Sequence, residues 1–87
     1  MSASFIFRVE FRRLSSLIKN LDSSLVNEIA LDEEIERIKL YLNLEQMRFQ
    51  DKFTYTIHVD KDIEQQSIKI PPMLLQPFVE NAIIHGI

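Results

Sequence analysis

Residues 31–59, LDEEIERIKLYLNLEQMRFQDKFTYTIHV, contain the change of hydrophobic period that decides the fold. In the first part of this stretch, apolar residues recur at steps of four and three, the spacing of one helix face: Leu31, Ile35, Ile38 and Leu42. From Phe53 to Val59 apolar and polar residues alternate, which is the pattern of a half-buried strand. The acidic run 32–34 suits the positively polarised first turn of a helix. We therefore expect a helix that begins near Ala30, followed by a strand over 53–59.

The N-terminal part of the chain carries a second helical pattern. Its apolar residues again alternate steps of four and three, as in a coiled coil: Phe7, Phe11, Leu14, Ile18, Leu21 and Leu25. This spacing predicts a helix from about Ser4 to Asp22. The step from Leu25 to Leu31 breaks the phase across a polar segment, so two helices joined by a linker are expected. Because a helix this early has few partners in so short a chain, its apolar stripe favours dimerisation over a place in the chain's own core.

The C-terminal part predicts a second strand and a third helix. After a polar turn and loop, residues 68–70 are expected to form a second short strand that Pro71 and Pro72 end. From Met73 to His85 apolar residues return to helical spacing, and Gly86 follows as a C-terminal cap. The order helix, helix, strand, strand, helix predicts an α+β fold.

The composition narrows the classes of function. The chain has 87 residues, enough for one small domain, and its 46% hydrophobic and 26% charged residues are typical of a protein that folds. A formal net charge of -3 argues against nucleic-acid binding, and zero cysteines exclude disulfides and thiolate metal sites. Residues 1–13 match neither a signal peptide nor a membrane span. The single glycine, Gly86, leaves no loop that could wrap phosphates.

Two motifs resemble those of a known family. Residues 70–87, IPPMLLQPFVENAIIHGI, resemble the N box of LytS-type sensor histidine kinases, where the pattern is close to IPPLLLQPLVENAIKHGI. Residues 40–49, LYLNLEQMRF, resemble the YLxIExxRF signature that joins the dimerisation helices of that family to its ATPase domain. The resemblance implies a helical dimerisation and linker segment over 1–50. It also implies the incomplete N-terminal part of a Bergerat-type ATPase domain over 51–87.

The resemblance also implies which residues face a nucleotide. It places Asn81 as a Mg²⁺ ligand beside the triphosphate and His85 one turn later, near the phosphates. Residues four apart share a helix face, and a neutral amide oxygen is a hard ligand that adds no negative charge. For Glu80, about 100° around the helix from Asn81, a catalytic role at the phosphate and a capping or pairing role both stay open. Ile84 stands where the family commonly has lysine, which puts a cationic phosphate contact from that position in doubt.

The resemblance implies a longer parent kinase. In that kinase, ATP would phosphorylate a histidine, and the phosphoryl group would pass to an aspartate of a response regulator. Neither His58, on the polar face of the 53–59 strand, nor His85 matches the phosphoacceptor position, and the family's glycine-rich boxes lie downstream. This chain alone is expected to bind no nucleotide and to be inactive, whereas the parent would bind ATP and Mg²⁺. The parent would be a homodimer through the helical arm, with this segment on the cytoplasmic side and its membrane anchor outside the chain.

A second class of function also fits the sequence. The chain could be a non-enzymatic helical interaction module, in which the apolar stripe pairs with itself or with another kinase and the N box is idle. For Glu45 and Arg48, three apart on the 31–50 helix, an exposed ion pair and an interdomain contact both stay open.

Overall fold

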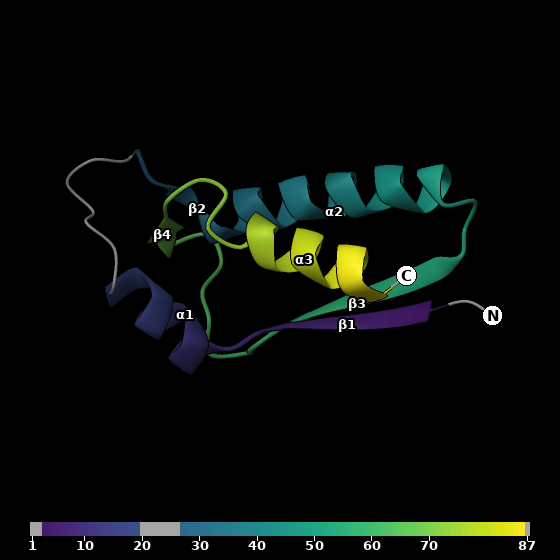
Figure 1. Cartoon of the computed structure of the whole chain (residues 1–87). Helices are drawn as coiled ribbons and strands as arrows, with labels where there is room; N and C mark the ends of the chain where they lie inside the picture. The colour runs from purple at the N-terminus through teal and green to yellow at the C-terminus, as the bar shows by residue number, and fades with distance from the viewer. Residues whose placement is uncertain (1–2, 20–26, 87) are drawn as a thin grey trace.

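The computed structural model describes residues 3–19 and 27–86. Within these residues the elements are, in chain order, β1 (Ala3–Val9), α1 (Phe11–Lys19), β2 (Ile29–Ala30), α2 (Leu31–Arg48), β3 (Phe53–Val59), β4 (Lys69–Ile70) and α3 (Gln76–Gly86) (Figure 1). Helices and strands are thus mixed in one chain, and the predicted α+β class is confirmed. None of the helices in the described ranges is long and apolar enough to cross a membrane.

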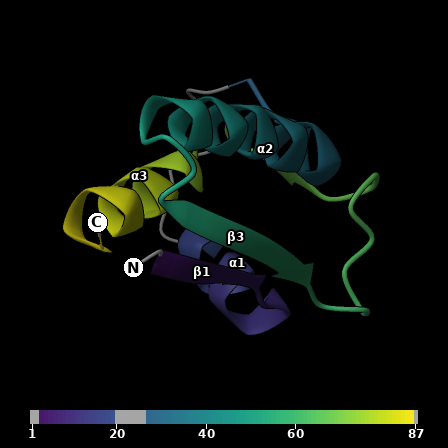
Figure 2. The same ribbon diagram turned by 90° about the vertical axis from the view of Figure 1, so that its right-hand side faces the viewer.

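Strands β1 and β3 form a parallel pair, and a second, antiparallel pair joins β2 to β4. The register of the first pair runs from Ala3 opposite Phe53 to Val9 opposite Val59. Helices α2 and α3 lie beside each other on one side of this pair (Figures 1 and 2). The alternate residues of β3 that face away from the helices are exposed, among them His58. The half-buried strand predicted over 53–59 is therefore confirmed.

The core consists of two hydrophobic clusters. The first is built from Leu14, Leu31, Ile35, Ile63 and Ile70. The second is built from Ile38, Leu42, Phe53, Val79 and Ile83. Helix α2 contributes to both because its buried residues follow one another along a single face, and Leu75 packs against both from the segment before α3. Helix α2 therefore connects the two parts of the core.

Helix α2 confirms the helix expected from the four-and-three spacing. It begins at Leu31, and Ala30 before it has the extended backbone of an N-cap residue, with φ -68 and ψ 146. Beyond its end, Gln50 and Asp51 both have positive φ, at 56 and 61, so the chain reverses there at some conformational cost. The side-chain amide of Gln46 donates a 3.2 Å hydrogen bond to the carbonyl of Phe53, which ties the helix to the start of β3.

The helix predicted from Ser4 to Asp22 is wrong in its first part. Residues 3–9 form strand β1, and the helix begins only at Phe11. The same residues carry a two-residue alternation, with Phe5 and Phe7 turned toward the helices and their neighbours exposed. Both periods pass through Phe7 and Phe11, and pairing with β3 selects the strand for the first segment. Residues 20–26, which include the end of the predicted helix and most of the predicted linker, lie outside the described residues.

The loop after β3 sets where α1 begins. The carboxylate of Asp60 accepts a 2.9 Å hydrogen bond from the backbone N–H of Phe11, in the first turn of the helix. The backbone N–H of Asp60 in turn donates to the carbonyl of Val9 at 3.0 Å. Further along α1, Leu14 is buried in the first cluster and Ile18 packs against it. Part of the apolar stripe assigned to dimerisation therefore packs inside the chain itself.

The C-terminal helix differs from its predicted form at both ends. It begins at Gln76 rather than Met73, because residues 71–75 form a turn that holds Met73 at a φ of 63. Gly86 is the last residue of α3 and has no positive φ, so it does not act as a left-handed cap. A Cβ on Gly86 would lie 2.5 Å from Cε1 of Phe5, so this glycine permits a close approach between α3 and β1.

Candidate nucleotide-binding helix

Helix α3 presents two different faces. Its inner face buries Val79 and Ile83 in the second cluster against α2 and β3. Its outer face carries Phe78, which is 59% exposed, and Ile84, which is 71% exposed. Two large apolar side chains are therefore exposed on the outer side of α3.

The structure brings Asn81 and His85 together on this outer face. Both are exposed, and they lie one turn apart on α3, as residues at this spacing must. Asn81 stands between Phe78 and Ile84, three residues from each, so polar and apolar groups alternate along the face. Asn81 and His85 are thus accessible on one face of α3, and their contact with a nucleotide stays a prediction.

Glu80 does not join this pair. It is half-buried, and its carboxylate accepts a 3.0 Å hydrogen bond from the side-chain amide of Gln76, one turn earlier on α3. Its charge also acts on Tyr41 of α2. This hydrogen bond is a pairing contact of the kind that the sequence left open for Glu80, and a catalytic role for this residue stays untested.

Tyr41 lies where acidic side chains of α2 and α3 meet. Burial raises the pKa of its hydroxyl above the ordinary value of 10.0; the negative charges of Glu45 and Glu80 raise this pKa further, and Arg48 lowers it. Arg48 itself pairs with Glu45 at 3.6 Å, but its side chain is 73% exposed, so this ion pair contributes little to stability.

We expect the phenol of Tyr41 to titrate above pH 10.0, its ordinary midpoint, because the ionised form is disfavoured by burial and by neighbouring carboxylates. A pKa raised by folding means that the stabilisation is complete below the unfolded pKa and is lost as pH rises through the folded pKa. Stability should therefore fall more steeply above about pH 10 in the original chain than in Tyr41→Phe. Ultraviolet absorbance titration and urea unfolding at several pH values measure both effects.

Tyr55→Phe is the matched control for this prediction. Tyr55 is the other tyrosine of the chain, and its hydroxyl donates a 2.7 Å hydrogen bond to the side-chain oxygen of Asn43. In this variant the pKa of the Tyr41 hydroxyl should stay raised. Identical pH profiles for the original chain and Tyr41→Phe would contradict the expectation.

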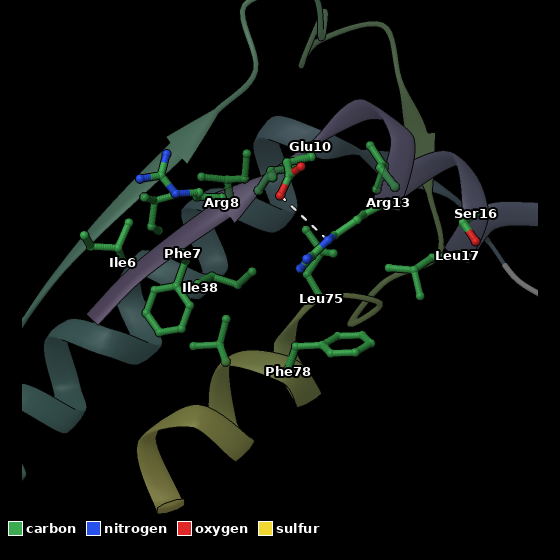
Figure 3. A pocket seen from close by; sticks show the side chains of 15 residues that line it. Ile6, Phe7, Arg8, Glu10, Arg13, Ser16, Leu17, Ile38, Leu75 and Phe78 are labelled. Atoms are coloured by element: carbon green, nitrogen blue, oxygen red, sulfur yellow. Dashed lines mark ion pairs between the residues drawn. The ribbon is translucent and has the colours of Figure 1, made fainter. Parts of the chain in front are cut away.

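A groove of about 450 Å³ opens between β1, α1 and α3 (Figure 3). Phe7, Leu17 and Phe78 give it apolar walls, and the ion pair of Glu10 with Arg13, at 3.7 Å, lies at its rim. Asn81 is not among its lining residues, and neither are Glu80 and His85. The sequence did not indicate this groove, because it depends on β1 being a strand rather than the start of a helix.

The described residues form no cluster of side chains that would hold a metal ion by itself. In residues 3–19 and 27–86, no three histidine, aspartate or glutamate side chains gather closely enough to hold a metal ion. A Mg²⁺ ion held mainly by nucleotide phosphates needs only one or two protein oxygens, and the exposed amide of Asn81 is a donor of that kind. The chemistry of this one amide oxygen is consistent with a Mg²⁺ ion held mainly by nucleotide phosphates, and such binding stays a prediction.

Comparison with known proteins points to the same family as the two sequence motifs. A family model described as histidine kinase matches residues 9–53, which run from the end of β1 to the start of β3. The chain belongs to the histidine kinase family.

Curated relatives narrow the assignment within this family. The chain is 42% identical over 67 residues to the sensor protein LytS of Staphylococcus haemolyticus, a match that covers 77% of this chain and 11% of the relative. It is 43% identical over 60 residues to the sensor histidine kinase YpdA of Escherichia coli, covering 69% of this chain and 10% of that kinase. The chain thus corresponds to a LytS-type histidine kinase over about a tenth of the relatives' length. No solved structure matches it.

Proposed function

We propose that this chain supplies the linker helix and the nucleotide-facing N-box helix of an ATP-dependent sensor histidine kinase in a two-component system. The observation that carries the proposal is the outer face of α3, where Asn81 and His85 lie together and exposed. Its support comes from the N-box resemblance and from relatives named as sensor histidine kinases.

Each residue of the face has a distinct part in this proposal. The amide oxygen of Asn81 would hold Mg²⁺ beside the triphosphate, and His85, one turn later, would donate a hydrogen bond to a phosphate oxygen. Phe78 and Ile84 would exclude water along the same face. Bound ATP supplies the phosphoryl group. Glu80, hydrogen-bonded to Gln76, would orient the helix rather than act on the phosphate.

Further assignments belong to the same proposal. The phosphorylated histidine would be one other than His58 and His85, and the receiver an aspartate of a response regulator. The kinase would act as a homodimer on the cytoplasmic side of a membrane. Because Leu14 of α1 is buried within the chain, the dimer contact would use exposed apolar residues of that helix, such as Phe11, which is 53% exposed.

The test is Mg-ATP binding measured by calorimetry. The chain alone is compared with a chimera in which it replaces the matching segment of the Escherichia coli sensor kinase. We expect binding by the chimera and none by the chain alone. In the chimera, Asn81→Ala should weaken binding by at least about tenfold, or about 1.4 kcal/mol, because a Mg²⁺ ligand is lost.

Asn27→Ala is the matched control, since Asn27 is exposed and lies outside the helices and strands. It should leave the affinity unchanged. A chimera that folds but does not bind Mg-ATP would reject the kinase role and favour the non-enzymatic interaction module. Equal affinities for the Asn81→Ala and Asn27→Ala chimeras would reject Asn81 as the ligand.

A further inference from the structure

The turn before α3 has few backbone N–H groups. Pro71 and Pro72 carry no backbone N–H, and Met73 follows with a φ of 63, a value that costs a side-chain-bearing residue conformational energy. The N–H of Leu74 donates to the carbonyl of Pro71 at 3.3 Å. The N–H groups of Met73 and Leu75 donate to no backbone carbonyl in the described part of the chain.

Both of these amides donate to a single side chain, Glu34 of α2. The N–H of Met73 donates to Oε1 of Glu34 at 3.1 Å, and the N–H of Leu75 donates to Oε2 at 3.1 Å. Glu34 is 39 residues from the first amide and 41 from the second, so the contact joins distant parts of the chain. Each carboxylate oxygen accepts one hydrogen bond from an amide. Two such bonds fix both the position and the orientation of the turn relative to the carboxylate.

Glu34 is also fully buried, at 0% exposure, next to Leu31 and Ile35 of the first cluster. A buried carboxylate is costly unless its oxygens are matched by donors. None of the ion pairs found within residues 3–19 and 27–86 involves Glu34. Its compensation in the described structure therefore comes from the two backbone amides of the turn.

The turn held by Glu34 is continuous with α3. Leu75, held by Glu34, is the residue directly before Gln76, where α3 begins. Asn81 lies six residues beyond Leu75, or about 9 Å along a helix. A change in how the carboxylate holds the turn would therefore move Asn81 with the helix.

We propose that Glu34 is a positioning residue that sets the placement of α3, and thereby of Asn81 and His85, relative to α2. A movement of α2 would reach the outer face of α3 through this carboxylate, in addition to the packing of apolar side chains. The consequence for nucleotide affinity rests on the proposed function, whereas the placement of α3 does not.

The first experiment follows α3 in the 87-residue chain by NMR, without nucleotide. Glu34→Gln keeps the size of the side chain but replaces one acceptor oxygen with an NH₂ donor, so one of the two amides loses its partner. We expect hydrogen exchange at Met73 or Leu75 to accelerate at least about tenfold, and the resonances of Asn81 and His85 to shift.

Glu33→Gln is the matched control, because Glu33 is exposed, lies one residue away and contributes the same charge to the first turn of α2. It should leave exchange and resonances in α3 unchanged. If Glu34→Gln fails to fold, Glu34→Asp takes its place, since it keeps both oxygens but withdraws them by one carbon–carbon bond. Unshifted Asn81 and His85 resonances, or accelerated exchange spread equally over β1 and β3, would overturn the proposal.

The second experiment measures Mg-ATP affinity in the kinase chimera. Glu34→Gln should weaken binding about tenfold while Glu33→Gln has no effect, a difference that loss of overall stability alone would not produce in folded protein. Equal affinities for the two variants would overturn the coupling to the nucleotide. If the original chimera binds no nucleotide, the proposed function fails, and the resonances of α3 still decide whether Glu34 places the helix.

Discussion

Replacing Phe53 with alanine is expected to lower the free energy of unfolding by about 3–5 kcal/mol, because a large aromatic ring is lost from the core. Phe53 is 0% exposed and is a member of the second cluster. Its ring meets Phe5 edge to face, with centroids 5.6 Å apart, and Phe49 at 6.3 Å. The substitution would remove the contact that joins β1, β3 and the end of α2. Urea unfolding followed by circular dichroism measures the loss.

Phe78→Ala is the control for this prediction. It makes the same chemical change at a residue that is 59% exposed, so the expected change is within about 0.5 kcal/mol. If Phe53→Ala does not fold, Phe53→Leu retains most of the volume and should cost about 1–2 kcal/mol. Equal losses for Phe53→Ala and Phe78→Ala would show that Phe53 is not at the centre of the core.

The second large effect is expected at Leu42. This residue is 0% exposed in the middle of α2, where it packs in the second cluster with Ile38 and Val79. Leu42→Ala should cost about 2–5 kcal/mol, since the substitution removes buried carbons and leaves a cavity that the rigid helix cannot close. In a chain of this size, each kcal/mol shifts the melting temperature by roughly 4–8 °C, so a fall of about 10 °C or more is expected.

Leu40→Ala is the control that separates the effect of burial from the effect of helix propensity. Leu40 is on the same helix, two residues away, but it is 61% exposed. Both variants gain the same small helix propensity of alanine over leucine, so their difference measures packing alone. Leu40→Ala should melt within about 3 °C of the original chain. A comparable loss for Leu40→Ala would show that the outer face of α2 is covered in solution.

The candidate site could be predicted only in part from the sequence. The spacing of Asn81 and His85 places them on one face of any helix, and the structure leaves that face exposed. The engagement of Glu80 with Gln76 is also local, since the two residues are four apart, but several arrangements were open to this carboxylate. The raised pKa of Tyr41 and the groove beside α1 depend on contacts between elements, so neither was foreseen.

The sequence by itself determined α2 and β3, because their hydrophobic periods are unambiguous and each period matches only one regular structure. Only the tertiary structure decided the state of residues 3–9, where a strand period and a helix period coexist and pairing with β3, about 50 residues away, selects the strand. The tertiary structure also decided the surroundings of Glu34, which the sequence placed only in the first turn of a helix and which lies fully buried, bound to the amides of Met73 and Leu75. Periodicity reports which side of an element is apolar, whereas strand pairing and carboxylate burial depend on partners far along the chain that no local pattern contains.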